Sequence, residues 1–225
     1  MRELQRKITV GPDTKVSSAW AVPGSYKGDS ALILAHGAGK DMHEPLLSFV
    51  HTELARRGVL TVKFNFPYKE RGGKAPDRPA VLEATWRAVI DAVRKDEKLA
   101  PSRLFIGGKS MGGRIASHLA AADNACDGLV FLGYPLHPPN KTERIRANHL
   151  TDIACPMLFL QGDRDALCKL DLLRPVLKGL SARVSLHVIE GGDHSFKVLK
   201  RLGRDEAEIR DEIIDVTSQW LTSHD

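Results

Sequence analysis

The chain has 225 residues, of which 42% are hydrophobic and 27% are charged, and this composition excludes a disordered tail and a membrane-spanning protein. The length predicts one domain over residues 1–225, with a core that needs no disulfide bonds. The formal net charge of +5 is mild and scattered, so we expect no nucleic-acid partner, although the basic stretch 197–204 keeps that class as an alternative.

Short apolar runs alternate with helical periodicity along the chain. The predicted strands are residues 19–22, 31–35, 59–66, 104–107, 128–133, 157–160 and 184–189. Apolar residues at helical spacing between them predict a helix that Gly58 ends, a second with Pro79 in its first turn and a third that Asp205 caps. This alternation predicts the α/β class, with a doubly wound, mostly parallel sheet and helices on both of its faces.

Cysteine usage and the first residues of the chain bear on the compartment. Cys126, Cys155 and Cys168 form no C-x-x-C pair, which predicts reduced thiols and a cytoplasmic location. The residues after Met1 are mostly polar, so we expect neither a signal peptide nor a membrane partner. The sequence has no H-E-x-x-H and no cysteine and histidine cluster at zinc-ligand spacing, so we expect no metal ion and no cofactor.

A G-x-S-x-G pattern at residues 108–112 lies between the predicted strand 104–107 and a helical stretch. A serine on such a turn needs small residues at both glycine positions, and the turn lifts its hydroxyl above the sheet. The following helix start offers unpaired N–H groups to a developing oxyanion. We therefore predict that Ser110 is a nucleophile; the alternative is a glycine-rich turn whose serine only caps the helix.

Gly108-Lys109-Ser110 is also the end of a phosphate-binding P-loop, G-x-x-x-x-G-K-S. That motif requires glycine where this chain has Arg103, and its loop would fall in a predicted strand. The second near-match, residues 37–41, has Leu34 at the first glycine position and Asp41 where serine or threonine is needed. Neither segment is a P-loop.

A serine hydroxyl needs a base that takes its proton. His194 follows the last predicted strand and starts a loop, at the sheet edge where Ser110 is expected. The orienting carboxylate should follow the preceding strand, where Asp163 and Asp165 are both available. We favour Asp165, which would hold the imidazole tautomer and stabilise the imidazolium, and Asp163 stays open.

Residues 36–39, His-Gly-Ala-Gly, leave the predicted strand 31–35 through a tight turn. In this architecture such a turn supplies one backbone N–H of an oxyanion hole, and the residue after the serine supplies the other. We therefore predict Ala38 and Met111 as the two donors. His36 is expected to pack in the turn rather than to bind a ligand.

Together these segments resemble the α/β-hydrolase superfamily: H-G-A-G at 36–39, G-K-S-M-G-G-R at 108–114, Q-G-D-R-D at 161–165 and G-G-D-H-S-F at 191–196. More narrowly, they and the segments 64–68, 76–79 and 134–139 resemble compact bacterial proteins related to the animal testis-expressed hydrolase and to subunit three of the NSL chromatin complex. Dienelactone hydrolase is more distantly similar, although the nucleophile here is a serine. The resemblance implies the fold, the triad and the oxyanion turn, and it implies no substrate.

The gap from residue 137 to residue 155 leaves room for one short helix and for no lid, which predicts an open site. Tyr68 and His137 are candidate substrate-binding residues at its rim. Five basic residues flank the loops of the active edge, and they form either an electropositive mouth or a merely solvated rim: Lys40, Lys69, Lys109, Arg164 and Lys197.

These observations predict a serine hydrolase of small or short-chain carboxylic esters, with thioesters and lactones open to the same chemistry. It would work through an acyl-enzyme on Ser110, His194 and Asp165, with a small-molecule ester as its partner. The alternative is a catalytically silent hydrolase fold that acts as a protein-interaction scaffold. The acyl and alcohol groups and the oligomeric state do not follow from the sequence.

Overall fold

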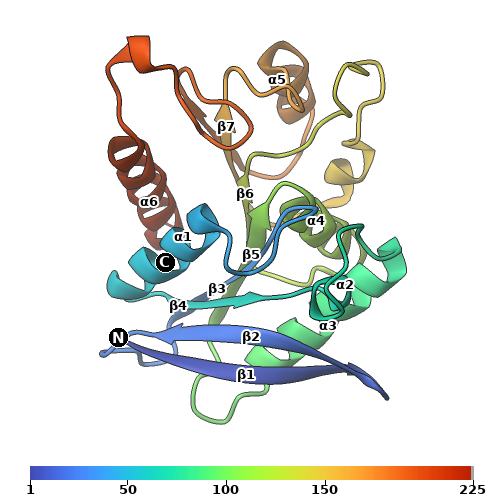
Figure 1. Ribbon diagram of the computed structural model, residues 1–225, viewed down its shortest axis with the longest axis vertical. Helices are drawn as coiled ribbons and strands as arrows, with labels where there is room; N and C mark the ends of the chain where they lie inside the picture. Colours follow the sequence, from blue (N-terminus) through green and yellow to red (C-terminus); the bar gives the residue numbers. More distant parts are fainter. Residues whose placement is uncertain (224–225) are drawn as a thin grey trace.

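The computed structural model describes residues 1–223. Within them, eight strands form one sheet in the order β1-β2-β4-β3-β5-β6-β7-β8, in which β1 and β2 are antiparallel to their neighbours and the others are parallel. The sheet twists strongly, from β1 and β2 drawn across the bottom of Figure 1 to β6 and β7 drawn upright. The strands are β1 (Arg2–Gly11), β2 (Thr14–Val22), β3 (Ser30–Ala35), β4 (Leu60–Phe64), β5 (Arg103–Lys109), β6 (Gly128–Leu132), β7 (Met157–Gly162) and β8 (Val184–Ile189).

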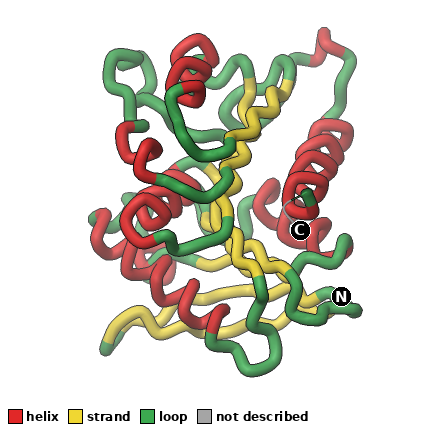
Figure 2. Tube along the Cα trace, turned by 180° about the vertical axis from the view of Figure 1, so that it is seen from behind, coloured by secondary structure: helices red, strands yellow, loops and turns green. Residues whose placement is uncertain are grey.

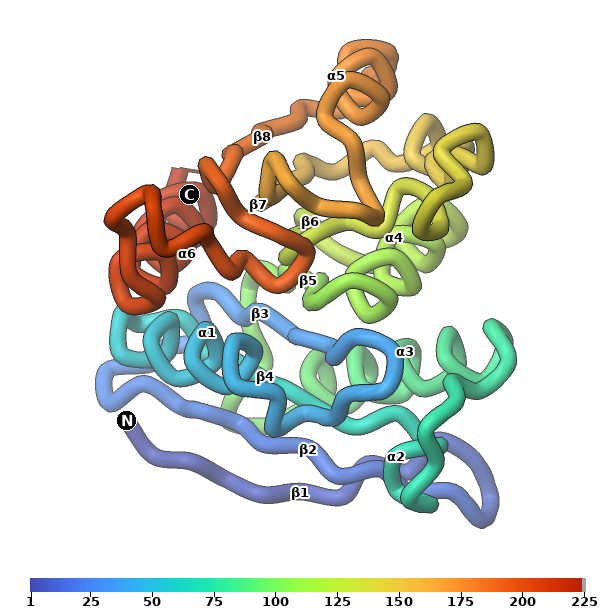
Figure 3. The backbone as a smooth tube through the Cα atoms, turned by 45° about the horizontal axis from the view of Figure 1, so that its top comes forward, coloured from blue at the N-terminus to red at the C-terminus, as the bar shows by residue number. Residues whose placement is uncertain are grey.

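Helices cover both faces of this sheet (Figure 2). The helices α1 and α6 lie together on one side, and α3 and α4 lie on the other (Figure 3). The predicted α/β class, doubly wound with a mostly parallel sheet, is thus confirmed. The helices are α1 (Pro45–Arg56), α2 (Pro67–Glu70), α3 (Pro79–Arg94), α4 (Met111–Asp123), α5 (Leu170–Lys178) and α6 (Glu206–Thr222), with 3₁₀ turns η1 (Asn148–Asp152) and η2 (Lys200–Leu202).

The central strand β3 shows how the two faces are built. Its alternate residues Leu32 and Leu34 pack into the core under α1 and α6. Ile33 and Ala35 belong instead to the core under α3 and α4. A parallel strand buried on both faces needs apolar side chains at every position, which is why its run was visible in the sequence.

The predicted helix boundaries agree with the structure. Pro79 is the first residue of α3, and Gly58 follows the end of α1 with φ of 97°. Asp205 caps α6, and its carboxylate accepts from the Glu208 N–H while Glu208 bonds back to the Asp205 N–H.

Among the strands and α-helices, β1, α2 and α5 were not predicted, and each omission has a physical reason. α2 has only four residues, too few for an apolar periodicity. β1 is an edge strand whose exposed positions are polar and charged, so it lacks the apolar run that marks the inner strands. α5 is short and contains Pro175, which removes a helical hydrogen bond. The predicted strand 59–66 is also too long, because Phe66 already caps α2.

The connection from β6 to β7 has only η1 as regular structure. As predicted, no lid domain is inserted there. No helix within residues 1–223 combines the length and the apolar character needed to cross a membrane.

Glu70, the last residue of α2, ties this helix to the β1–β2 hairpin. Its carboxylate accepts from Lys7 Nζ at 2.8 Å, from the Ser17 N–H at 3.1 Å and from Asn65 Nδ2 at 3.0 Å. Burial alone would raise the pKa of Glu70, but these hydrogen bonds outweigh it and lower the pKa to about 2. The ionised form of Glu70 therefore stabilises the fold.

We predict that Glu70→Gln lowers the free energy of unfolding at neutral pH by about 1–3 kcal/mol, the value of charged hydrogen bonds. Because the folded pKa lies below the usual value of 4.5, the contribution of Glu70 is complete above that value and is lost as the pH falls towards about 2. Urea titrations across this pH range should therefore show the deficit of Glu70→Gln shrinking in acid.

Glu53→Gln is the matched control, because Glu53 pairs with Arg56 on the surface of α1. We expect its effect to stay within about 0.5 kcal/mol. A Glu70→Gln deficit that does not change with pH, or that equals the control, would contradict the prediction.

Candidate active site

Ser110 occupies the turn between β5 and α4, with φ of 51° and ψ of −116°. Such a backbone conformation is strained for a residue other than glycine and persists only where the surroundings enforce it. The Ser110 N–H donates to the Leu132 carbonyl at 3.2 Å, and its carbonyl accepts from the Arg114 N–H at 3.0 Å. These bonds fix the turn at the carboxyl end of β5 and leave the side chain half-buried.

The two glycines of the pattern are required by close backbone contacts. A Cβ on Gly108 would lie 2.1 Å from the Ala35 carbonyl oxygen, and φ at Gly108 is 136°. A Cβ on Gly112 would lie 2.4 Å from the same oxygen. The start of α4 thus rests directly on the end of β3, with no room for a side chain at either position.

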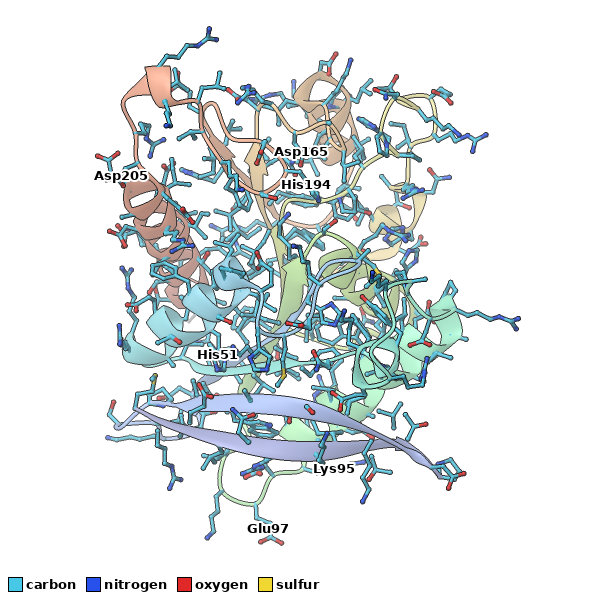
Figure 4. All side chains as sticks on the ribbon, viewed as in Figure 1. His51, Lys95, Glu97, Asp165, His194 and Asp205 are labelled. Carbon is cyan, nitrogen blue, oxygen red and sulfur yellow. The ribbon has the colours of Figure 1, made fainter. Side chains whose placement is uncertain are left out.

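Ser110 is joined to His194 and Asp165 by consecutive hydrogen bonds. Ser110 Oγ lies 2.8 Å from His194 Nε2, and His194 Nδ1 lies 2.6 Å from Asp165 Oδ2. The Asp165 and His194 side chains lie close together where the loops after β7 and β8 meet (Figure 4). Asp163 is exposed, and it is Asp165 that contacts His194.

Further hydrogen bonds orient the Asp165 carboxylate, which is fully buried. Its Oδ1 accepts from the Leu167 N–H at 2.7 Å, and its Oδ2 accepts from Gln161 Nε2 at 2.5 Å. Gln161 is itself held, because its Oε1 accepts from the Tyr134 N–H at 2.9 Å. Since a carboxylate only accepts, Nδ1 of His194 carries the proton, and Nε2 is left to accept from Ser110.

Lys109 fastens the loop of His194 to β5. It is buried, and its Nζ donates to the His194 backbone carbonyl. Burial lowers the pKa of Lys109 to about 8, against the opposing effect of Asp165 and other nearby carboxylates. The residue before Ser110 thus holds the backbone of the histidine that contacts it.

The loops that bear Asp165 and His194 also pack directly on each other. A Cβ on Gly162 would lie 2.2 Å from the Gly192 carbonyl oxygen. The Arg164 N–H donates to that same oxygen at 2.9 Å. The loop that carries Asp165 and the loop that carries His194 are therefore packed together as one unit.

The turn at residues 36–39 lies beside Ser110. A Cβ on Gly37 would be 3.5 Å from the Ser110 Cβ, and both Ala38 and Met111 line the same pocket as Ser110. Within residues 1–223, neither the Ala38 N–H nor the Met111 N–H donates a hydrogen bond to another protein group. Both backbone donors thus belong to residues that line the pocket beside the hydroxyl.

His36 packs behind this turn, the role expected of it. Its Nδ1 donates to the Gly37 carbonyl at 2.9 Å, and its Nε2 accepts from the Phe66 N–H at 3.2 Å. Burial lowers the pKa of His36 to about 4, so the ring is neutral in the physiological range.

The pocket that contains Ser110 has a volume of about 430 Å³. Its apolar lining comes mainly from Leu82, Met111, Ile115, Leu167 and several prolines, and its polar lining from Asp77, Ser110, Arg114, His137 and Arg146. No group of three or more His, Cys, Asp or Glu side chains within residues 1–223 is arranged to hold a metal ion.

The structure separates the two predicted rim residues. His137 lines the pocket, although both of its ring nitrogens bond to backbone groups, of Pro138 and Lys169. Tyr68 is buried, packs against the His36 ring and is not part of the pocket lining.

None of the five basic residues singled out from the sequence lines the Ser110 pocket. Lys40 and Lys197 line a different one, of about 370 Å³, between α1 and α6. The basic residues that line the Ser110 pocket are Arg114 and Arg146 instead. For Arg114 the available signal was its position one helical turn after Ser110.

Comparison with known proteins agrees with the fold. The model of a family described as "Alpha/beta hydrolase domain" matches residues 28–222. An alpha-beta serine hydrolase homologue from Coxiella burnetii superposes with a TM-score of 0.74 and 20% identity over 94% of this chain and 96% of that one. Dienelactone hydrolase from Anabaena variabilis superposes with a TM-score of 0.77 and 18% identity, over 99% of this chain and 97% of that one. XC6422 from Xanthomonas campestris, described as a serine hydrolase without lid, superposes with a TM-score of 0.72 and 19% identity, over 97% of this chain and 94% of that one.

We predict that Gly112→Ala destabilises the protein by about 1–3 kcal/mol or more, because the new methyl group overlaps the Ala35 carbonyl. Thermal unfolding of the purified variant measures this loss. Gly179→Ala is the control, since a Cβ there meets nothing closer than 3.5 Å. Equal unfolding temperatures for the two variants would show that β3 and α4 are not in close contact.

Proposed function

The chain belongs to the α/β hydrolase domain family, and on that premise we propose that it is a serine hydrolase of small or short-chain carboxylic esters. The observation that supports this proposal most strongly is the unbroken series of hydrogen bonds from Ser110 through His194 to Asp165. Nucleophile, base and orienting acid stand at the distances that acyl transfer requires.

In the first half of the proposed reaction, Ser110 Oγ attacks the ester carbonyl carbon and its proton passes to His194 Nε2. Asp165 stabilises the resulting imidazolium without taking its proton. The Ala38 and Met111 N–H groups bind the negative oxygen of the tetrahedral intermediate, and losing one such donor typically costs about 10²–10³ in rate. The intermediate collapses when the bond to the leaving oxygen breaks and that oxygen takes the proton from His194.

In the second half, water replaces the alcohol. His194 removes a proton from the water molecule as its oxygen attacks the acyl-enzyme carbonyl. The bond to Ser110 then breaks, and Ser110 regains the proton held on His194. The balance is one ester and one water converted into one acid and one alcohol. Thioesters and lactones fit the same steps.

The shape of the site favours small substrates. The β6–β7 connection holds only the 3₁₀ turn η1 as regular structure, so no lid domain is inserted between these two strands. A pocket of about 430 Å³ suits a short acyl or alcohol group.

A catalytically silent scaffold is the alternative function. It has no chemical need for an aligned serine, histidine and buried carboxylate, so the hydrogen bonds of His194 argue against it. The narrower relationship to the testis-expressed hydrolase and to subunit three of the NSL complex stays a prediction. So do a single domain over residues 1–225, a cytoplasmic location and the absence of a nucleic-acid partner.

We predict that a fluorophosphonate probe labels the parent protein and that Ser110→Ala abolishes the labelling. Hydrolysis of p-nitrophenyl butyrate should fall by about 10³-fold or more in Ser110→Ala. In Asp165→Asn it should fall by about 10²–10⁴-fold, because the wrong imidazole tautomer is then held.

Asp163→Asn is a matched control on the same loop, since Asp163 is exposed and Asp165 makes the contact to His194. We expect it to retain nearly the full rate. A folded parent protein that is neither labelled nor active would refute the proposed function. Equal losses in the two asparagine variants would refute the assigned acid.

A further inference from the structure

Two arginines, Arg114 and Arg146, line the pocket that contains Ser110. Arg114 lies in the first turn of α4, and Arg146 precedes η1. Within residues 1–223, neither guanidinium forms an ion pair with an aspartate or glutamate. Other arginines of the chain, such as Arg71 and Arg204, do form such pairs.

Neutral groups hold Arg114 in place. Its Nη1 donates to His118 Nε2 at 3.2 Å, and the His118 ring stacks on His149 with centroids 3.8 Å apart. Burial lowers the pKa of both histidines, that of His149 to about 4, so their rings add no charge in the physiological range. This arrangement orients the guanidinium but leaves its positive charge uncompensated.

Arg146 lines the same pocket, and both arginines also line a neighbouring pocket of about 340 Å³ with His118 and His149. The backbone of Arg146 is fixed at two points, because its N–H donates to the Leu136 carbonyl at 2.8 Å and its carbonyl accepts from the Tyr134 hydroxyl at 2.7 Å. Burial lowers the pKa of Arg114, and Arg146 is near enough to lower it further. Two like charges are therefore held close together without a counter-ion, at a cost that a bound anion would offset.

Asp77 is the one carboxylate in the pocket lining, and its oxygens are already engaged. Its Oδ2 accepts from the Tyr68 N–H at 2.8 Å, and its Oδ1 pairs with Arg71 at 2.5 Å. Asp77 is thus hydrogen-bonded to residues in and directly after α2, and not to either pocket arginine. Apolar side chains, including Met111, Ile115 and Leu167, make up much of the remaining lining.

From this arrangement we propose that Arg114 and Arg146 form an anion-binding subsite, and that the substrates are esters with a carboxylate separated from the ester group by a short apolar chain. Guanidinium groups suit this recognition because they offer several donors to two carboxylate oxygens at once. The inference rests on the proposed function for the reaction, whereas the subsite itself can be tested by binding alone.

The binding experiment uses Ser110→Ala, in which the ester is not consumed. Isothermal titration compares monomethyl glutarate, which carries one carboxylate, with dimethyl glutarate, which is neutral. We expect the anion to bind more tightly by about 10-fold or more. Adding Arg146→Gln, at an exposed position, should remove most of that preference, and added salt should weaken it.

The kinetic experiment uses the parent protein and two pairs of substrates. In one pair the acyl group carries the charge: the p-nitrophenyl monoester of glutarate against p-nitrophenyl pentanoate. In the other the alcohol carries it: p-carboxyphenyl butanoate against phenyl butanoate. A preference in kcat/KM for the charged member of one pair identifies the side of the ester that the arginines bind. We expect Arg114→Gln and Arg146→Gln to lower that preference on the order of 10- to 100-fold.

Arg144→Gln is the matched control, because Arg144 lies on the same loop, is exposed and is not part of the pocket lining. It should leave both preferences as they are. Equal binding of the two glutarate esters, or an equal effect of the Arg144 and Arg146 variants, would overturn the subsite. Preferential binding of the anion by a protein that hydrolyses no ester would uphold the subsite and refute the proposed function.

Discussion

The contact between the end of β3 and the start of α4 is the constraint on which the site depends. Because Gly108 and Gly112 both lie against the Ala35 carbonyl, the helix start is held next to the turn at residues 36–39, whose Gly37 lies beside Ser110. The strained backbone of Ser110 is tolerated because both of its neighbours are fixed. Any widening of this contact would shift the start of α4 and Ser110 relative to the turn at residues 36–39, so the geometry of the site is set by backbone packing.

The rest of the site is a network of buried polar groups that are hydrogen-bonded to one another. Gln161 joins the Asp165 carboxylate to the backbone after β6, and Lys109 joins β5 to the backbone of His194. Each buried polar group of this network thus has a partner on another strand end or loop. Such satisfied networks favour a single arrangement, because each alternative leaves a buried donor or acceptor unpaired.

How far the sequence predicted this structure differs between its parts. The inner strands were visible because burial on both faces requires continuous apolar runs, whereas β1 faces solvent and was missed. Ser110 and Asp165 follow two such strands and His194 follows the edge strand β8, whose apolar residues were also recognised. Their meeting at the carboxyl edge of the parallel strands was therefore predictable. The preference for Asp165 over Asp163 was open because a hydrogen bond from Gln161 and the path of one short loop decide it. The pocket lining at Arg146 depends on the course of a long connection that has no periodic pattern, and the burial of Tyr68 depends on α2, which has four residues.

The direct contact between Gly162 and Gly192 has a consequence for how relatives of this chain diverge. Since the acid loop and the histidine loop share a backbone interface, an insertion in either would disturb both, and selection should hold their lengths constant. The connections that carry Asp77 and Arg146 also line the pocket. The second is joined to the acid loop near its own start, where the His137 N–H donates to the Leu167 carbonyl at 3.0 Å, whereas Arg146 lies farther along it at an exposed position. Duplicated copies of such a gene can therefore acquire new substrate preferences through substitutions at exposed positions such as Arg146 while the lengths of the acid and histidine loops stay the same.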